Sequence, residues 1–173
     1  VKTEALDIAQ AADINIIYIG ENGGWNSDNT TKNDNDAQDL VVLIEKMLSK
    51  TKNPEKYIVI GLQNGSQPQT DVALSEAFGE HLILPKTYLA TKTVLTDSGI
   101  TPTANDLTAI ENGKIPPSIL STDGVHMNDA GYAALAKMVF NKMQELGYYS
   151  EPVRLVSKHS DANDLKEMSI SRA

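Results

Sequence analysis

The chain has 173 residues, 40% of them hydrophobic, and a formal net charge of −8, values that are typical of one globular domain with a core of its own. An acidic surface repels nucleic acid and anionic membranes, and no apolar run is long enough to span a bilayer. Because the chain has no cysteine, disulfides, thiolate nucleophiles and cysteine-ligated zinc are excluded.

The N-terminal part of the chain predicts two helices with a strand between them. Residues 2–11 are rich in helix formers, and the β-branched run Ile14–Ile19 predicts a short buried strand. A polar loop over 21–35 follows, and then a helix over 36–49 that Asp36 is expected to cap. The apolar residues of this helix are spaced for one buried face: Leu40, Leu43, Ile44, Met47 and Leu48.

The alternation of strand and helix continues after residue 56. Tyr57–Leu62 predicts a second buried strand, and His81–Leu84 predicts a third, shorter one. Helices are expected over about 71–78 and over 86–97, with a short helical turn near 104–111.

The last helix is expected from Asp129 to about Leu146. Asn128 is placed to cap its start, and Gly147 is placed to end it. We therefore assign residues 1–148 to one domain and residues 149–173 to a polar tail or linker. Strands that alternate with helices favour an α/β fold, in which helices cover both faces of a parallel sheet.

Asp123 and His126 lie in the stretch Asp-Gly-Val-His-Met-Asn-Asp-Ala-Gly-Tyr, which leads into the last helix. The Asp can accept the proton-bearing ring nitrogen of the His, which fixes the tautomer and leaves the other nitrogen free as a general base. A capping Asp beside a surface His has the same spacing. The prediction that the pair is catalytic therefore depends on the whole stretch.

A second motif, Gly20-Glu21-Asn22-Gly23, follows the first predicted strand. A Gly-x-Asn at the carboxyl end of a strand can present its amide to a developing oxyanion, although Gly and Asn are also common in ordinary turns. In parallel sheets the functional crevice lies outside the carboxyl ends of the strands. Both this motif and the Asp123 loop fit that location.

In this order, the two motifs resemble the later conserved blocks of the SGNH, or GDSL-type, esterases, over a span from about residue 13 to residue 147. The resemblance implies a flavodoxin-like three-layer α/β/α sandwich with five parallel strands. It further implies that Asn22 contributes to the oxyanion hole, with Gly20 shaping its turn. Asp123 would be the orienting acid and His126 the general base.

The family's Gly-Asp-Ser block, which holds the nucleophile, and its second-block Gly have no counterpart in this chain, and Gly23 replaces a family Asp. Ser66 follows the second predicted strand without a nucleophile elbow, and Ser121 also lacks one. We expect the missing strand and serine to lie upstream of Val1 and to be supplied by a companion chain. Exchange with a second copy of the chain, or a rebuilt sheet, are the alternatives.

The resemblance implies a serine esterase that hydrolyses carbohydrate O-acyl esters, in particular a deacetylase, without cofactor or metal. Trp25, in the loop after Asn22, can stack on a sugar ring or fold back onto the domain. Lipid esters and thioesters remain open as substrates. Asn33–Asp36 lacks the Gly and the distal Glu of a calcium loop. The alternative function is a catalytically inactive glycan-binding or structural module that keeps the fold without the serine.

Overall fold

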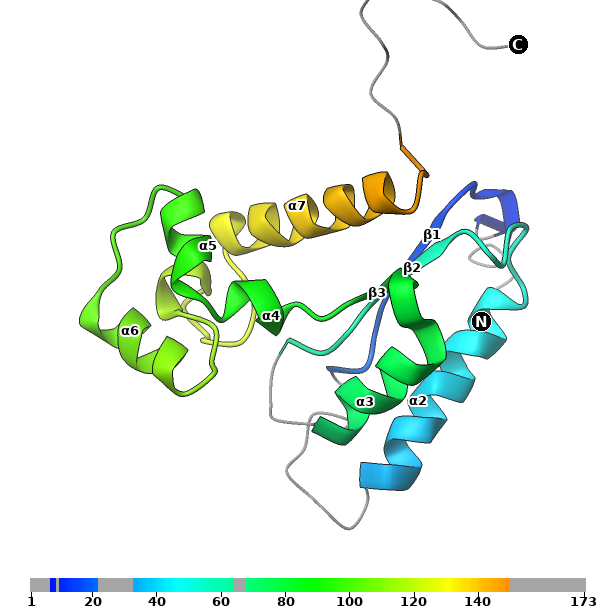
Figure 1. Cartoon of the computed structure of the whole chain (residues 1–173), viewed down its shortest axis with the longest axis horizontal. Helices are drawn as coiled ribbons and strands as arrows, with labels where there is room; N and C mark the ends of the chain where they lie inside the picture. The colour runs from blue at the N-terminus through cyan, green and yellow to red at the C-terminus, as the bar shows by residue number, and fades with distance from the viewer. Residues whose placement is uncertain (1–6, 9, 22–32, 64–67, 150–173) are drawn as a thin grey trace, which may run out of the picture.

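The computed structural model describes residues 7–8, 10–21, 33–63 and 68–149 (Figure 1). These residues form an α/β fold around a three-stranded parallel sheet with the strand order β1-β2-β3. The strands are β1 (Asn15–Tyr18), β2 (Tyr57–Ile60) and β3 (Leu82–Ile83). Each lies within a segment that the sequence predicts to be a strand. The resemblance implies five strands, and the described residues contain three.

The register of the sheet decides which face each side chain occupies. Ile16 and Tyr18 of β1 stand opposite Ile58 and Ile60 of β2. Because side chains alternate along a strand, these four residues share one face and Ile17 points to the other.

Helices α2 (Asn33–Leu48) and α3 (Pro68–Phe78) connect the strands and pack against each other on one face of the sheet (Figure 1). They enclose one of two apolar clusters. Its buried members come from the two helices and from the strand side chains that point toward them: Ile17, Leu40, Val41, Ile44, Leu48, Val59, Leu74 and Phe78.

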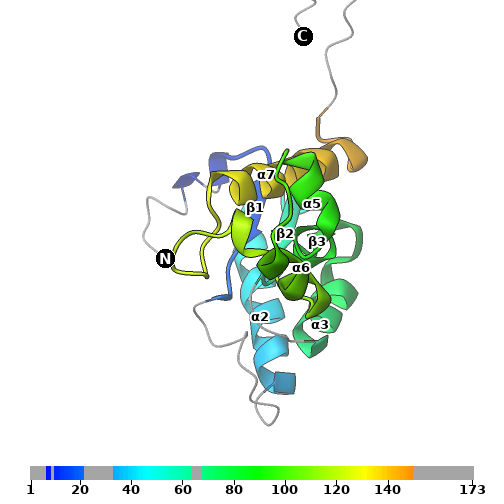
Figure 2. The ribbon, with the colours of Figure 1, turned by 90° about the vertical axis from the view of Figure 1, so that its left-hand side faces the viewer.

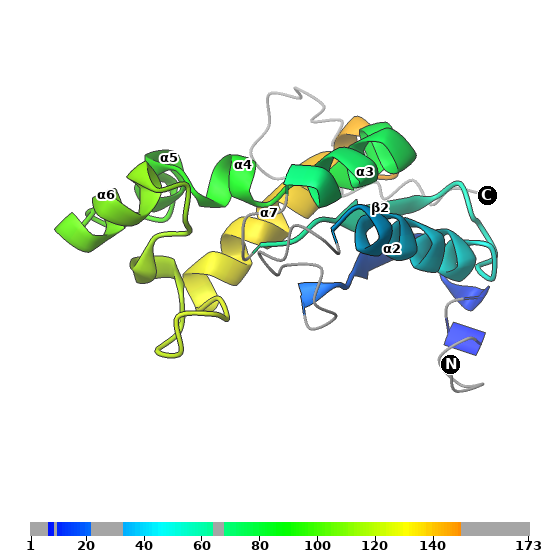
Figure 3. The same ribbon diagram turned by 90° about the horizontal axis from the view of Figure 1, so that it is seen from below.

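Helix α7 (Asp129–Glu145) covers the opposite face, where it contacts β2 and β3 (Figure 3). The sheet is therefore the middle of three layers. The helix runs against the direction of the strands, so its N-terminus lies on the side of their carboxyl ends (Figure 1). The second apolar cluster fills this side, and its buried members include Ile58, Ile60, Ile83, Leu89, Leu95, Ile119 and Leu135.

Three short helices, α4 (Lys86–Leu89), α5 (Lys92–Asp97) and α6 (Ala104–Glu111), form a lobe beyond the carboxyl ends of the strands (Figures 1 and 2). The single helix predicted over 86–97 is wrong, because the chain becomes extended at Thr91. The break has a packing reason. Leu89 and Leu95 are both fully buried in the same cluster, yet residues six apart do not share a face of one continuous helix.

The prediction for α2 was partly wrong. The helix begins at Asn33, so Asp36 lies inside it and is not its cap. Leu43 and Met47, expected to be buried, are exposed. The buried face instead consists of Ala37, Leu40, Val41, Ile44 and Leu48. Leu40, Ile44 and Leu48 form the middle of the apolar face, and helical periodicity allows the residues on either side of them to be buried. The position of the sheet and α3 decides that Ala37 and Val41 are buried and that Leu43 and Met47 are exposed.

The third strand is shorter than predicted. His81 belongs to a 3-10 turn, η2 (Gly79–His81), and Leu84 lies beyond the strand's end. The His81 ring stacks on Tyr57 with a centroid separation of 4.3 Å, and its Nδ1 lies 3.0 Å from the Tyr57 carbonyl oxygen. This histidine therefore has a structural role at the amino-terminal end of β2.

Gly131, in the first turn of α7, allows the helix to approach the segment before it very closely. A Cβ at this position would lie 2.4 Å from the carbonyl oxygen of Ile119 and 2.8 Å from Cβ of Met127. Ile119 belongs to the second 3-10 turn, η3 (Pro117–Ile119). Only glycine fits against both the Ile119 carbonyl and the Met127 side chain.

We predict that Gly131→Ala lowers the free energy of unfolding by about 1–3 kcal/mol, the usual cost of overpacking. Helix propensity alone would raise the free energy of unfolding of Gly131→Ala by about 1 kcal/mol, so the sign of the change distinguishes overpacking from propensity. Urea unfolding measures it, with Ala133→Ser at an exposed position of the same helix as the control. Unchanged or increased stability in Gly131→Ala would contradict the close approach.

Candidate functional site

Asp123 and His126 are hydrogen-bonded immediately before α7. Nδ1 of His126 lies 2.6 Å from Oδ2 of Asp123. A carboxylate can only accept, so Nδ1 carries the proton, and in the neutral ring Nε2 keeps its lone pair. The His126 side chain is 69% exposed, and Nε2 makes no hydrogen bond to any described residue. The ring is therefore fixed at one nitrogen and open to solvent at the other.

The second oxygen of Asp123 is saturated by local donors. Oδ1 accepts from the Ser121 hydroxyl at 2.6 Å and from the backbone N–H groups of Val125 and His126 at 2.8 and 2.9 Å. The Ser121 hydroxyl, the His126 ring and the two N–H groups hold the pKa of the Asp123 carboxyl well below its usual range. Asp123 therefore stays ionised at neutral and mildly acidic pH.

Ser121 acquires a role that its sequence position does not reveal. Its hydroxyl donates to the Asp123 carboxylate, which is the partner of Nδ1 and not of Nε2. In this arrangement Ser121 supports the acid and is not placed as a nucleophile for His126.

The backbone on either side of the pair closes the loop. Leu120 and Met127 form an isolated antiparallel bridge, and the Ser121 N–H donates to the His126 carbonyl at 2.8 Å. Gly124 lies at the tip with φ 69°, in the left-handed region that favours glycine. The loop is thus a small closed unit that carries Asp123 and His126.

Asn128 caps α7, as predicted, and also ties the helix to the preceding segment. Its Oδ1 accepts from the N–H groups of Ala130 and Gly131 at 3.0 and 3.2 Å. Its Nδ2 donates to the carbonyls of Ser118 and Leu120 at 3.0 and 3.1 Å. One side chain therefore fixes both the helix and the start of the loop.

Asp106 is a fully buried carboxylate that anchors this segment to α6. It completes a capping box with Thr103 and accepts from the N–H and hydroxyl of Ser118 at 2.9 and 2.8 Å. Burial alone would raise the pKa of Asp106, but the hydrogen bonds from Ser118 and Thr103 outweigh it and hold the pKa at about 2. The Thr103-to-Asp106 spacing is visible in the sequence, whereas the bonds to Ser118 depend on tertiary structure.

Gly20 lies two residues beyond β1 with φ 117°, and a Cβ there would lie 2.8 Å from the Leu62 side chain. The next residue, Glu21, accepts a hydrogen bond from the Gln63 N–H. The Gln63 side chain in turn donates to the Val125 carbonyl at 3.1 Å. Gln63 thus brings the Gly20 turn and the Asp123–His126 loop together at the carboxyl edge of the sheet. The sequence did not point to Gln63, because these two contacts are with distant residues.

Three other residues considered in the sequence lie outside the described residues: Asn22, Trp25 and Ser66. Groups of three or more His, Asp or Glu side chains able to hold a metal are absent from the described part of the chain. Its helices also include none that is long and apolar enough to cross a membrane.

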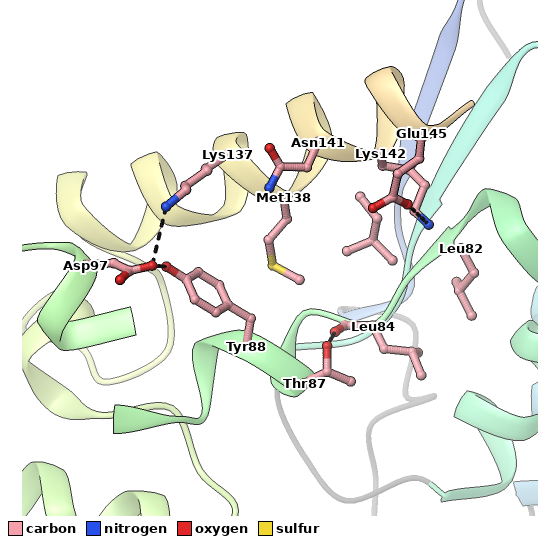
Figure 4. A pocket seen from close by; sticks show the side chains of 11 residues that line it. Leu82, Leu84, Thr87, Tyr88, Asp97, Lys137, Met138, Asn141, Lys142 and Glu145 are labelled. Carbon is pink, nitrogen blue, oxygen red and sulfur yellow. Dashed lines mark hydrogen bonds and ion pairs between the residues drawn. The ribbon is translucent and has the colours of Figure 1, made fainter. Parts of the chain in front are cut away.

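A cleft of about 400 Å³ lies between β3, α4, α5 and α7 (Figure 4). Its charged groups neutralise one another: Lys137 lies 3.3 Å from Asp97, Asp97 accepts from the Tyr88 hydroxyl at 2.7 Å, and Lys142 pairs with Glu145. Neither Asp123 nor His126 lines this cleft. We therefore place the candidate site at the Asp123–His126 loop.

Comparison with known proteins gives no assignment: no family model, no curated protein and no solved structure matches the chain. The interpretation of the site therefore depends on its own geometry.

We predict that Asp106→Asn lowers the free energy of unfolding by about 1–3 kcal/mol at pH 7, because charged hydrogen bonds are lost. The pKa of Asp106 is about 2 in the folded chain and about 3.9 when unfolded. Its contribution is therefore complete above the unfolded pKa and is lost as pH falls from about 4 to about 2.

Urea unfolding at pH 7, 4 and 2.5 tests this prediction. The stability difference between wild type and Asp106→Asn should shrink at the lowest pH. Glu111→Gln, at an exposed position at the end of the same helix, is the matched control and should change stability little at any pH. A deficit that is independent of pH would show that the charge of Asp106 does not contribute.

Proposed function

We propose that this chain forms part of an SGNH-type serine esterase that deacetylates carbohydrate O-acyl esters, and that the nucleophilic serine comes from outside residues 1–173. The observation that carries the proposal is the 2.6 Å contact between Asp123 and His126, combined with an exposed Nε2. An acid that is ionised at neutral pH and hydrogen-bonded to one ring nitrogen is what a general base needs in order to take a proton at the other.

In the proposed reaction, Nε2 of His126 removes the proton of the serine hydroxyl as the oxygen attacks the ester carbonyl. Asp123 stabilises the imidazolium that forms. The amide of Asn22 stabilises the oxyanion, with Gly20 shaping the turn. His126 then returns the proton to the departing alcohol, and water hydrolyses the acyl-enzyme with the same base. These steps need no cofactor.

The open edge of the sheet supports a serine supplied from elsewhere. β1 pairs only with β2, so no described strand covers its other edge, which could accept a further strand. Ile16, which points to the α7 side, is 49% exposed, because α7 covers mainly β2 and β3. A parallel strand added here would end at the same edge as Gly20.

An apolar groove of about 370 Å³ lies between β2 and α7, on the face of the sheet where Ile16 is exposed. Ile60 and the apolar face of α7 line it, including the exposed side chains of Tyr132 and Phe140. A helix that followed the added strand would cover the groove. We propose that the serine-bearing segment is such a strand-helix unit, which would extend the sheet toward the five strands of the flavodoxin-like fold.

The proposed preference for carbohydrate esters follows from the family resemblance and from Trp25, an aromatic residue that can stack on a sugar ring. The exposure of His126 agrees with an open site. An esterase of this kind would release acetate from acetylated oligosaccharides.

The first test is a fluorophosphonate probe applied to the complete protein, with any companion chain present, and to residues 1–173 alone. We expect a labelled serine outside residues 1–173, no label on these residues alone, and no label in His126→Ala. Peptide mapping by mass spectrometry locates the serine.

A label within residues 1–173 would contradict the proposed origin of the serine. Absence of label in the complete protein would contradict the esterase, and binding of acetylated glycan without label would indicate the binding module.

The second test concerns the acid. Asp123→Asn can turn its amide N–H toward Nδ1, so His126 takes the tautomer that carries its proton on Nε2 and cannot act as the base, and we expect labelling and acetate release to fall roughly 10⁴-fold. Asp129→Asn is the matched control, because Asp129 is an exposed carboxylate three residues beyond His126. Equal effects of the two substitutions on labelling would indicate that activity depends only on the net charge near His126 and not on the contact with Asp123.

A further inference from the structure

Gln63 is a buried polar side chain at the point where three segments meet. It lies three residues beyond β2 and is only 7% exposed. Its Oε1 accepts from the hydroxyl of Tyr18, the last residue of β1, and its Nε2 donates to the Val125 carbonyl at 3.1 Å. These contacts join residues 45 and 62 positions apart in the chain.

The Tyr18 hydroxyl determines how the Gln63 amide is oriented. Burial, together with the nearby charge of Glu21, raises the pKa of Tyr18, so its hydroxyl keeps its proton at neutral pH. That proton is donated to Oε1, which leaves Nε2, the donor end of the amide, directed at Val125. A side chain that could only accept would face the Val125 carbonyl unfavourably.

Val125 is held through both sides of its backbone. Its N–H donates to Asp123 within the loop, and its carbonyl accepts from Gln63 at the edge of the sheet. The contact between Asp123 and His126 spans three residues and forms within the loop. The position of the loop relative to the sheet depends on contacts with distant residues, of which this is one.

We propose that Gln63 is a positioning residue: its amide N–H holds the Asp123–His126 loop over the carboxyl edge of the sheet and so sets where Nε2 of His126 meets substrate. This role rests on the proposed function insofar as His126 is the base. It requires a hydrogen-bond donor at position 63, not merely a side chain of that size.

Two variants distinguish the loss of the hydrogen-bond donor at position 63 from a change in packing. Gln63→Met fills a similar volume without a donor. Gln63→Glu is acceptor-only when ionised and regains an O–H donor when protonated, and its buried site should raise its pKa toward neutrality. The measurement is the ¹⁵N backbone order parameter of Gly124, Val125 and His126 at pH 8 and pH 5, with α2 as the internal reference.

In the wild type we expect loop order parameters of about 0.85 at both pH values, typical of a rigid backbone. Gln63→Met should lower them below about 0.6 at both pH values. Gln63→Glu should lower them at pH 8 and recover at pH 5, a reversal that a packing defect cannot produce. The proposal would be overturned if the loop order parameters of Gln63→Met equalled those of the wild type. It would also be overturned if the loop order parameters of Gln63→Glu did not rise at pH 5 while α2 stayed ordered.

Loop order is measured without substrate, so it is independent of the labelling experiment. In the complete enzyme, labelling of the serine should follow the same pattern, with Gln63→Glu slower at pH 8 relative to wild type and closer to it at pH 5. Normal loop behaviour without any labelling would contradict the proposed function. A labelling rate equal to that of the wild type in both Gln63→Met and Gln63→Glu would contradict the role of Gln63.

Discussion

A carboxylate removed from water must be hydrogen-bonded on every side, and Asp106 meets this requirement with donors from two segments. Its bonds to Ser118 fix the turn before the candidate loop, and the Ser118 carbonyl accepts in turn from Asn128, the cap of α7. The close approach of Gly131 to this turn follows from the same arrangement. Asp106 is thus a buried charge that ties the segment before the loop to the α6 lobe.

Asp106 and Asp123 are two ionised carboxylates in different surroundings, one buried and one partly exposed. Both have a pKa below the usual range because several donors stabilise the charged form. Asp106 is buried and uses its donors to join segments. Asp123 is partly exposed and directs one oxygen at the His126 ring. Only the second arrangement leaves a ring nitrogen, Nε2 of His126, open to solvent.

The layered fold explains why the candidate site lies at the carboxyl edge. Parallel strands end together, and α7 runs against them, so the loop before α7 returns to that edge (Figure 1). Gln63, at the end of β2, then contacts both the Glu21 turn and the loop. The same layering leaves β1 half covered, since α7 contacts β2 and β3 more than the outer strand. The groove lined by Ile60 and α7 and the exposed side chain of Ile16 therefore lie on the same face of the sheet.

The sequence alone determined the features that depend on near neighbours. The β-branched runs became strands, and Asn128 capped α7 because a cap needs donors only two and three residues away. Asp123 and His126, three residues apart, form their contact within one loop. Tertiary structure decided the buried flank of α2, the break at Thr91 and the bonds from Asp106 to Ser118. It also decided the contacts of Gln63, because these join segments 42 to 62 residues apart, and no periodicity specifies which distant surfaces meet.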